Sequence, residues 1–435
     1  MPFYSTNNRD SLVDVTEAIL NAQPVDKGLY MPQSIKPLPA SFWDQWQDWS
    51  LSEMAGEMLA HMLQDDVPAD VVKKIAQESF NFPAPVVALD GSIGILELFH
   101  GPTLAFKDFG ARFMARMMSY LTRDDNEPLT VLVATSGDTG GAVADAFFQV
   151  EGTEVIILYP QGKVSPLQEK QLTTLGSNIH AVEVKGTFDD CQALVKASFV
   201  DKELQAVYKL TSANSINIAR LLPQMVYYFD AVREQLKAGK AEPVMIVPSG
   251  NFGNICAGLF AKKIGLPIVH FIAATNINKV VPDYLSTGAY HPVPSIATIS
   301  NAMDVGAPSN FVRLQELYEH DLEAIRADIS GYFCDDEQNY QGVREVKANY
   351  NYTIDPHTAI GYLAAKEYLS EHPEANTIVL GTAHPAKFLE IMQEALPEHS
   401  IEIPQALLNL QDKEKTALLL SKDFNTFKEF LLNRK

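Results

Sequence analysis

Lys107 is the residue whose surroundings most strongly suggest chemistry, because its neighbours along the chain are apolar. These neighbours are Leu104, Ala105, Phe106 and Phe109. Burial disfavours an ammonium ion, so such a lysine has a lowered pKa, and its neutral amine is the nucleophile that forms a Schiff base with a carbonyl compound. The segment by itself leaves an alternative open, in which Lys107 reaches solvent and pairs with Asp108.

The segment Ser249–Asn254 (SGNFGN) has a composition suited to binding a small anion. It follows an apolar run typical of a strand and precedes a helical pattern over residues 255–264. Gly250 and Gly253 allow backbone N–H groups to converge, and the start of a helix adds a favourable dipole. The candidate monophosphate site consists of Ser249, Gly250, Asn251, Phe252, Gly253 and Asn254. An ordinary strand-to-helix turn is the alternative, and the segment matches neither a Walker loop nor GxGxxG spacing.

A second turn of small residues, Thr135–Gly141 (TSGDTGG), also stands between an apparent strand and an apparent helix. Its hydroxyl and N–H groups could hold a carboxylate at the helix start. The candidate residues are Thr135, Ser136 and Thr139, which carry hydroxyl groups, and the acidic residue Asp138. Ser136 or Asp138 could equally cap the helix, and the two roles are compatible.

Two further segments carry polar groups. Thr382 supplies a neutral hydroxyl in the turn Gly381–Pro385 (GTAHP), which by composition is only a loop. Ser212–Arg220 (SANSINIAR) places Asn217 and Arg220 at a spacing that puts both on one face of a helix. Without context, Arg220 is more typical of a surface ion pair than of a ligand clamp.

The turns gain significance from the elements that surround them. Apolar, β-branched runs alternate with helical patterns, as in a sheet covered by helices on both faces. The predicted strands are 129–134, 154–159, 179–184, 243–247, 268–273 and 377–380. This rhythm predicts a doubly wound α/β fold, in which ligands bind at the carboxyl ends of the strands. The candidate residues follow several of those ends.

The first 82 residues differ from the remainder. Residues 11–22 have a helical pattern with Ser11 as a plausible N-cap, and Trp43, Trp46 and Trp49 recur at a spacing that predicts one packed side of a helix. We therefore expect a small helical N-terminal domain over 1–82 and a catalytic region over 83–435, made of two α/β subdomains with the smaller at roughly 110–225. The tail, 412–435, has the pattern of a surface helix.

Composition limits the classes of partner and compartment. The formal charge is 34 − 54 = −20, which argues against nucleic acid or an anionic membrane as a partner. The three cysteines, Cys191, Cys256 and Cys334, are spaced for neither a disulfide framework nor a metal site, and we expect packing residues and no metal. The N-terminus does not resemble a secretory signal, and no apolar run is long enough to cross a bilayer. A cytoplasmic protein is the expectation.

Five segments together resemble the threonine synthase family and stand in the order found there. They are ELFHGPTLAFKDFG, ATSGDTGGAVA, SANSINIAR, PSGNFGN and LGTAHPAKF. The resemblance runs from the GLYMP segment near the N-terminus to LGTAHPAKF. It implies the tryptophan-synthase-β-like fold of pyridoxal-phosphate enzymes, with pyridoxal 5'-phosphate between two α/β domains behind an additional N-terminal domain. It also implies conversion of O-phospho-L-homoserine and water into L-threonine and phosphate.

The resemblance assigns roles to residues of this chain. Lys107 would form the Schiff base, the turn 249–254 would hold the cofactor phosphate, and Thr382 would face the pyridine nitrogen. The family often has aspartate at the position of Asn254, so only a contact that needs no carboxylate would be retained there. The residues implied at the substrate are Thr135, Ser136, Asp138, Thr139, Lys163, Asn214, Ser215, Asn217 and Arg220. Among them, Lys163, Asn217 and Arg220 would bind the substrate phosphate.

Other activities of the same fold are alternatives. A phospholyase or a serine or threonine dehydratase would share Lys107 and the phosphate turn, although a dehydratase needs no second phosphate pocket. A non-catalytic relative that binds pyridoxal phosphate is a further alternative, and retention of Lys107 and Thr382 argues against it. The sequence is compatible with a monomer or a homodimer.

Overall fold

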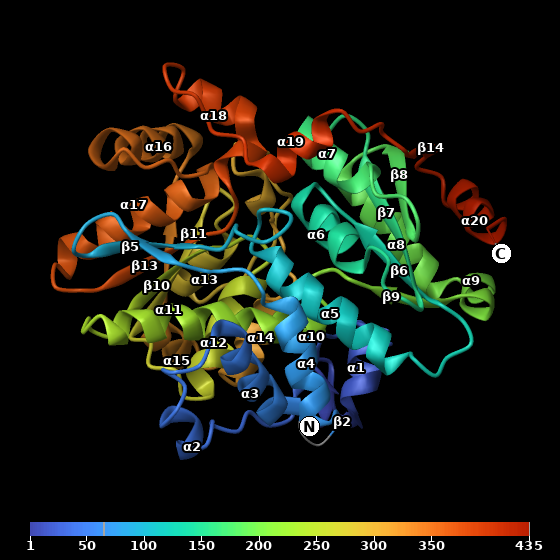
Figure 1. Ribbon diagram of the computed structural model, residues 1–435, viewed down its shortest axis with the longest axis horizontal. Coiled ribbons are helices and arrows are strands. Elements are labelled where there is room, and N and C mark those ends of the chain that lie inside the picture. The colour runs from blue at the N-terminus through green and yellow to red at the C-terminus, as the bar shows by residue number, and fades with distance from the viewer. Residues whose placement is uncertain (64–65, 435) are drawn as a thin grey trace.

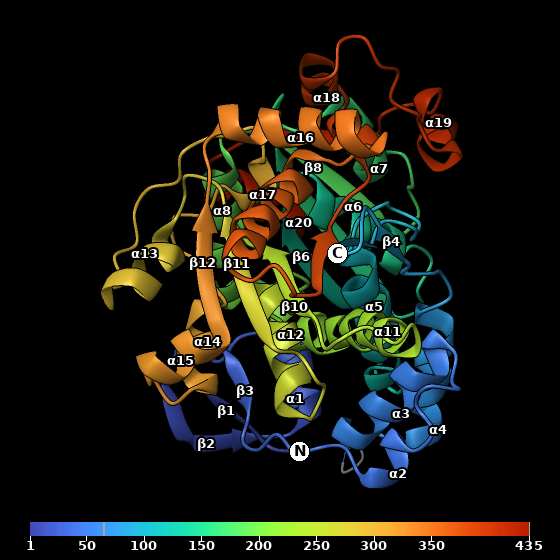
Figure 2. The same ribbon diagram turned by 90° about the vertical axis from the view of Figure 1, so that its left-hand side faces the viewer.

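The computed structural model describes residues 1–63 and 66–434. Two α/β lobes, each built on its own sheet, lie side by side, and the N-terminal region packs below both of them (Figures 1 and 2). The predicted pair of α/β units behind an additional N-terminal unit is therefore confirmed. Across the described ranges, no helix combines the length and apolar character needed to cross a lipid bilayer.

The larger lobe contains a six-stranded sheet with the order β12-β11-β10-β13-β5-β4. Its strands are β4 (Val86–Ala88), β5 (Ile93–Glu97), β10 (Val244–Pro248), β11 (His270–Thr275), β12 (Ile329–Phe333) and β13 (Thr377–Gly381). All neighbours are parallel except β4, which runs antiparallel to β5 at the edge. Strands β10 and β13 are buried along their whole length, as the apolar runs predicted.

Helices and 3-10 turns surround this sheet. They are α11 (Met225–Lys237), α12 (Gly253–Lys263), α13 (Val280–Thr287), η2 (Asn301–Met303), α14 (Phe311–Leu317), α15 (Leu322–Asp328), α16 (Asp336–Tyr350), α17 (Pro356–Glu371), η3 (Pro385–Phe388) and α18 (Leu389–Ala395). Helix α17 packs against four neighbouring strands, β10 to β13, and α13 packs against β11 and β12.

The smaller lobe contains a parallel five-stranded sheet with the order β14-β8-β7-β6-β9. Its strands are β6 (Leu129–Ala134), β7 (Thr153–Pro160), β8 (Ile179–Lys185), β9 (Lys209–Ser212) and β14 (Leu418–Ser421). Its helices are α5 (Lys107–Leu121), α6 (Asp138–Phe147), α7 (Pro166–Thr173), α8 (Phe188–Val200), α9 (Lys202–Val207), α10 (Ile218–Leu221), η1 (Leu222–Gln224), α19 (Gln405–Gln411) and α20 (Phe424–Leu432).

The C-terminal tail differs from its prediction as a surface helix. Strand β14 pairs with β8 at the edge of the smaller sheet, and α20 packs on α8 and α9. Phe427 and Leu431 of α20 are fully buried in this lobe. The smaller lobe is therefore completed by residues that follow the larger lobe in the sequence, so a single interval such as 110–225 does not contain it.

The N-terminal region contains a sheet that the helical patterns did not predict. Strands β1 (Phe3–Ser5), β2 (Asn8–Val13) and β3 (Tyr30–Pro32) form an antiparallel sheet, and helices α1 (Val15–Asn21), α2 (Ala40–Trp43), α3 (Leu51–Leu63) and α4 (Ala69–Ser79) accompany it. The prediction of Ser11 as N-cap is wrong, because Ser11 lies within strand β2. Asp14 caps α1 instead, and its carboxylate accepts a 2.8 Å hydrogen bond from the N–H of Glu17.

The three tryptophans do not share one helix, although their spacing predicted it. Helix α2 ends at Trp43, and Trp46 and Trp49 follow in turns. The rings nevertheless cluster, because Trp43 and Trp46 both contact Phe229 of α11. The triplet therefore packs the N-terminal region onto the larger lobe, and the predicted packing role is retained without the helix.

Candidate active site

The carboxyl ends of strands from both sheets bring the candidate segments together. Lys107 begins α5, and the preceding residue, Phe106, donates its N–H to the carbonyl oxygen of Thr382 at 2.9 Å. Ala105 and Ala383 form an isolated β-bridge beside this bond. Strand β13, which ends at Gly381 just before Thr382, is the direct neighbour of β10, which leads into the turn 249–254. Lys107, Thr382 and the phosphate turn thus belong to one edge of the larger sheet.

Lys107 is largely enclosed, with a side chain that is 15% exposed. Burial lowers the pKa of Lys107; Asp138 opposes this shift, whereas Lys387 and Arg220 reinforce it. The alternative pairing with Asp108 does not occur, because Asp108 accepts hydrogen bonds from the N–H and hydroxyl groups of Thr103. The Nζ atom of Lys107 instead lies 3.3 Å from Oδ2 of Asp138.

Asp138 is the most heavily contacted carboxylate of the site. Its Oδ1 atom lies 2.8 Å from Nζ of Lys387 and accepts a 2.8 Å hydrogen bond from Nε2 of Gln168. Burial on its own would raise the pKa of Asp138, but the ammonium groups of Lys387 and Lys107 hold it well below its ordinary range. Asp138 also begins α6, where the helix dipole favours a negative charge. The carboxylate is therefore ionised.

The turn after β10 has the geometry of an anion cradle. Gly250 packs so closely on η2 that a Cβ atom there would lie 2.8 Å from the carbonyl oxygen of Ala302. Phe252 has a left-handed backbone, with φ of 61°, and α12 begins at the next residue, Gly253. A non-glycine residue in this conformation is uncommon and occurs preferentially at functional sites. The strain turns the chain so that the helix start faces the site.

At this turn, the buried side-chain NH2 groups of two asparagines have no hydrogen-bond partner among the described residues. Oδ1 of Asn254 accepts from the hydroxyls of Tyr227 and Tyr228, while its Nδ2 donates to no described residue. Nδ2 of Asn310 is similarly unpartnered and lies 3.4 Å from the position of a Cβ on Gly253. Buried donors are normally satisfied, so unpaired donors at a helix N-terminus fit a bound phosphate group.

The turn after β6 has one internal support. The hydroxyl oxygen of Thr135 accepts hydrogen bonds from the N–H groups of Gly137 and Gly140, at 3.0 and 2.8 Å. Neither Ser136 nor Asp138 caps α6, because the N-cap is Gly137 and the Thr135 hydroxyl binds the first-turn N–H of Gly140. The capping alternative is therefore wrong. Ser136 and Thr139 are half-buried.

The segment after β9 contains two asparagines that differ in their hydrogen bonding. Both hydrogen bonds donated by the buried Asn217 side chain go to carbonyl oxygens, those of Ile19 and Ser212, and its Oδ1 accepts from the N–H of Ala219. Asn217 is thus committed to protein partners, which contradicts its expected place on the substrate phosphate. Nδ2 of Asn214 donates to the carbonyl oxygen of Ala134, whereas its buried Oδ1 has no protein partner.

Arg220 is not the surface ion-pair residue of the simpler interpretation. It is 3% exposed, donates to the carbonyl oxygen of Ala213, and has an unpartnered Nε–H group. Burial lowers its pKa to about 10, so the guanidinium keeps its charge at neutral pH. A buried cation with no carboxylate bound to it suits an anionic ligand. Lys163, by contrast, is exposed in the turn after β7.

Comparison with known proteins agrees with this arrangement. Family models match residues 2–80 (threonine synthase N terminus), 85–382 (pyridoxal-phosphate dependent enzyme) and 358–431 (threonine synthase, C-terminal). Threonine synthase from Escherichia coli K12 is 41% identical over 433 residues, covering 100% of both chains, and that from Serratia marcescens is 42% identical, covering 99% of each. The chain belongs to the threonine synthase family.

Solved structures extend this agreement to three dimensions. The Escherichia coli threonine synthase structure has a TM-score of 0.93 at 41% identity, with both chains fully covered. A pyridoxal-phosphate-bound threonine synthase from Brucella melitensis has a TM-score of 0.93 at 36% identity, covering 100% of this chain and 99% of that one. Maize serine racemase, at 18% identity and a TM-score of 0.55, shares the fold alone. As a threonine synthase family member, the chain uses pyridoxal phosphate as its cofactor.

The sequence interpretation missed several residues of this threonine synthase site. They are Lys387, Gln168, Asn310, Tyr227 and Tyr228. Only Lys387 carried a usable signal, since it stands between Ala386 and Phe388 much as Lys107 stands between apolar residues. The other four lie far from the turns in sequence, and only the fold brings them there.

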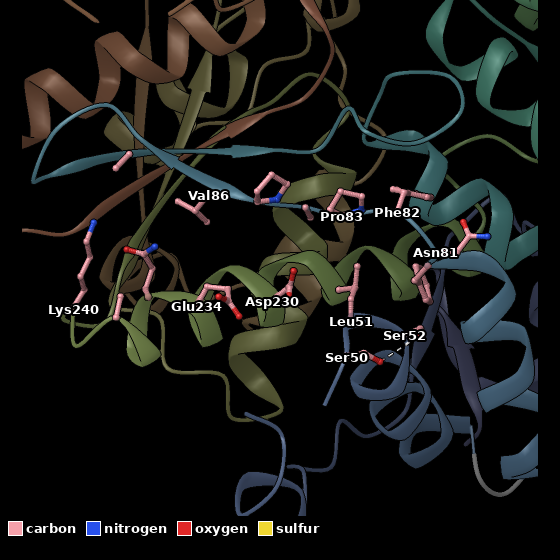
Figure 3. A pocket seen from close by; sticks show the side chains of 16 residues that line it. Ser50, Leu51, Ser52, Asn81, Phe82, Pro83, Val86, Asp230, Glu234 and Lys240 are labelled. Atoms are coloured by element: carbon pink, nitrogen blue, oxygen red, sulfur yellow. Dashed lines mark hydrogen bonds between the residues drawn. The ribbon is translucent and has the colours of Figure 1, made fainter. Parts of the chain in front are cut away.

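A cavity of about 700 Å³ lies away from this site, between the N-terminal region and α11. Figure 3 shows Asp230 and Glu234 of α11 facing the segment that carries Phe82, Pro83 and Val86. Neither Lys107 nor Thr382 lines it. The cavity is therefore separate from the candidate site.

Proposed function

We propose that the edge formed by Lys107, Thr382 and the turn 249–254 is the active site for converting O-phospho-L-homoserine and water into L-threonine and inorganic phosphate. The observation that carries this proposal is the enclosed amine of Lys107, whose pKa is lowered by burial. The residue before it, Phe106, forms a backbone hydrogen bond with Thr382. A neutral amine at this position can act both as a nucleophile and as a base.

The residues for the cofactor fit its phosphate and its ring. We assign the phosphate to the backbone N–H groups of the turn 249–254 and the start of α12, with the unpartnered Nδ2 of Asn254 as a further donor. We assign the pyridine nitrogen to the hydroxyl of Thr382, which need not keep that nitrogen protonated. When bound, pyridoxal phosphate supplies an electron sink for negative charge that develops on the substrate.

Lys107 then moves the protons of the reaction. With cofactor and substrate bound, the amine of Lys107 would remove the proton from the substrate α-carbon and would then transfer a proton at the β-carbon. Both transfers require the amine to lie on one face of the substrate, within hydrogen-bond reach of both carbons. The start of α5 provides this placement, since the backbone bond from Phe106 to Thr382 fixes where the lysine side chain begins.

The remaining polar groups orient the substrate. We assign its carboxylate to the turn after β6, where Ser136, Thr139 and backbone N–H groups of the α6 start are available. We also assign to the substrate Asn214, which donates to the carbonyl oxygen of Ala134 at the end of β6, and Ser215, which lies beside Gly253. We assign the substrate phosphate to the unpartnered Nε–H of Arg220, with the exposed Lys163 as a second cation. Asn217 supports this loop and contacts no substrate.

The organisation of the molecule follows from these assignments. We propose an N-terminal unit over 1–82 and a catalytic region over 83–435, whose smaller lobe extends from about 110 to 225 and is completed by β14 and α20. A small molecule is the substrate, and a monomer or homodimer in the cytoplasm is the proposed state. Neither nucleic acid nor a membrane is a proposed partner.

Lys107→Ala tests the proposal directly. The visible absorbance of the cofactor joined to the protein should be lost, and threonine formation should fall by at least about a thousandfold, because nucleophile and base disappear together. Lys366→Ala is the control and should keep both signals. Lys366 lies on α17 and forms a partly exposed ion pair with Glu345 of α16.

The assay should measure threonine and phosphate together. Phosphate without threonine would assign a phospholyase, and a 2-oxo acid formed from serine or threonine would assign a dehydratase. Wild-type-like absorbance in Lys107→Ala would move the Schiff base to another lysine and overturn the proposal.

A further inference from the structure

Lys387 lies in the candidate site, but the proposed reaction assigns it no role. It lies in η3, shortly after Thr382, and its side chain is fully buried. Its Nζ atom donates to the carbonyl oxygen of Thr103 at 2.7 Å and pairs with Oδ1 of Asp138 at 2.8 Å. Burying an ammonium ion is costly unless it is paired, so this contact is a built feature of the fold.

The same carboxylate lies within reach of Lys107. Oδ2 of Asp138 is 3.3 Å from Nζ of Lys107, while Oδ1 contacts Lys387 and Gln168. One carboxylate can neutralise only one of two buried ammonium ions. The shorter contact and the complete enclosure of Lys387 give that partner the carboxylate, and Lys107 faces a pair whose net charge is zero.

We propose that Lys387 is a positioning residue for Lys107, in that it holds the Asp138 carboxylate as its own counter-ion and so leaves the Lys107 amine in the uncharged form that captures an aldehyde. This inference rests on the proposed function of Lys107. In the capture step the neutral Lys107 nitrogen bonds to the aldehyde carbon and the bonds from that carbon to oxygen break. The oxygen leaves as water with one proton from the amine and one from solvent, and the nitrogen keeps its second proton and carries the positive charge.

Three other titratable groups face this network, namely Arg220, Asp108 and His384. Arg220 faces Lys107 from α10 and also disfavours its ammonium form. Asp108 faces Lys387 from α5, and burial raises its pKa to about 6. His384 lies on the same turn as Lys387, and burial lowers its pKa to about 4, so it is uncharged at neutral pH. Lys107 therefore has Asp138 as its only directly contacting anion among the described residues.

Removal of the Lys387 charge changes this balance. In Lys387→Met the ionised Asp138 would remain buried with Lys107 as the only cation in contact with it. An opposite charge within about 4–6 Å raises the pKa of a lysine by about 1–3 units. Lys107 would then hold its proton at neutral pH, and the fraction of nucleophilic amine would fall about tenfold for each unit.

The experiment follows capture of pyridoxal phosphate by the full chain freed of cofactor, as a function of pH. The rate of appearance of visible absorbance gives a midpoint that reports the proton on Lys107, and borohydride reduction with peptide mass analysis identifies the modified lysine. We expect the midpoint for Lys387→Met to lie at least about one pH unit above that of wild type, with capture at pH 7 at least about tenfold slower. Lys387→Arg should retain the wild-type midpoint.

A double variant separates this role from a purely structural one. Lys387→Met with Asp138→Asn removes both charges, so the midpoint should return toward wild type although the packing is altered further. Lys366→Met, at an ion pair remote from the site, is the matched control and should leave the midpoint unchanged. Circular dichroism should show which variants are folded, and if Lys387→Met alone does not fold, the double variant and Lys387→Arg still measure the midpoint.

The outcomes distinguish this inference from the proposed function. If wild type captures pyridoxal phosphate on a lysine other than Lys107, the proposed function fails. If capture occurs on Lys107 but the folded Lys387→Met variant keeps the wild-type midpoint, only the role of Lys387 fails. A double variant whose midpoint stays as high as that of Lys387→Met would likewise overturn it, because the carboxylate would then not be the cause.

Discussion

At the scale of single residues, the site is defined by side chains whose hydrogen bonding is incomplete. The sequence made Asn217 a candidate for the substrate phosphate and Asp108 a candidate partner of Lys107, yet the structure gives each of them other protein partners. Arg220, Asn254 and Asn310 keep buried N–H groups without partners. An unpaired buried donor costs about 1–3 kcal/mol, which a bound anion would recover. Within the candidate site, these unpaired donors mark the residues that we expect to bind an anion.

Arg220→Ala is the prediction that belongs to this scale. Loss of a charge-assisted hydrogen bond to the substrate phosphate should raise KM for O-phospho-L-homoserine about 10- to 100-fold, since such bonds contribute about 1.5–3 kcal/mol. Pyridoxal phosphate should still bind with wild-type absorbance. Steady-state kinetics and absorbance titration measure the two effects. Arg123→Ala, at an exposed residue beside Asp124, is the control, and unchanged kinetics for Arg220→Ala would exclude it from the site.

At the scale of elements, turns with unusual backbones aim the functional groups. Leu104 and Phe252 both have positive φ, at 60° and 61°, and stand just before Lys107 and α12 respectively. Such conformations cost about 1–3 kcal/mol and persist only where surrounding contacts enforce them. The close packing of Gly250 on η2 is one such contact. Strain at these turns is consistent with their function in placing an amine and a phosphate cradle.

The 3-10 helix η3 depends on the protonation state of one histidine. Nδ1 of His384 accepts a hydrogen bond from the N–H of Ala386, and burial lowers the pKa of His384 to about 4. The unfolded chain binds this proton near pH 6.5, so the stability that depends on neutral His384 is present above pH 6.5 and is lost as the pH falls toward 4. Between pH 7 and pH 5, the titration of His384 should lower the unfolding free energy of the wild-type protein by about 2 kcal/mol.

His384→Asn isolates this effect, because asparagine keeps an acceptor for the Ala386 N–H but does not titrate. We expect its unfolding free energy to fall by about 2 kcal/mol less than that of wild type between pH 7 and pH 5. Urea unfolding at both pH values measures the difference. Parallel losses in the two proteins would show that His384 does not carry this part of the acid sensitivity.

At the scale of the whole molecule, one buried guanidinium joins all three parts. Arg313 of α14 is fully buried and donates to the carbonyl oxygen of Tyr30 in the N-terminal sheet. It also donates to the carbonyl oxygens of Ser215 and Ile216 in the smaller lobe, and to Oδ1 of Asn310 beside the phosphate turn. The loop that carries Ser215 is therefore held in place from the larger lobe and from the N-terminal region together.

Arg313→Met should accordingly affect stability and substrate binding together. Leaving several buried acceptors unpaired should lower the unfolding free energy by about 2–4 kcal/mol, and the loosened loop should raise KM. Arg326→Met is a matched control, since Arg326 also donates to two carbonyl oxygens, of Leu285 and Ser286, but is partly exposed; it should cost about 1 kcal/mol or less. Equal losses in the two variants would contradict the joining role.

The sequence alone determined the parts of this protein that depend on local patterns. Six apolar runs became strands β6, β7, β8, β10, β11 and β13 with ends shifted by two residues at most, because residues buried on both faces must be apolar throughout. Long motif segments in a fixed order also carried the family resemblance that the comparisons confirmed. The apolar neighbours of Lys107 made it a candidate, and the family resemblance assigned it the Schiff base, which remains a prediction for the Lys107→Ala experiment.

The tertiary structure decided what depends on partners distant in sequence. Short strands such as β1, β9 and β14 form because a neighbour supplies their hydrogen bonds, so composition alone did not reveal them. Asp138 meets Lys387 across 249 positions of sequence, and Asn217 meets Ile19 across 198. Electrostatics and hydrogen bonding act over a few ångströms of space whatever the separation along the chain. Which polar residues support the fold, and which remain free for a ligand, was therefore fixed only by folding.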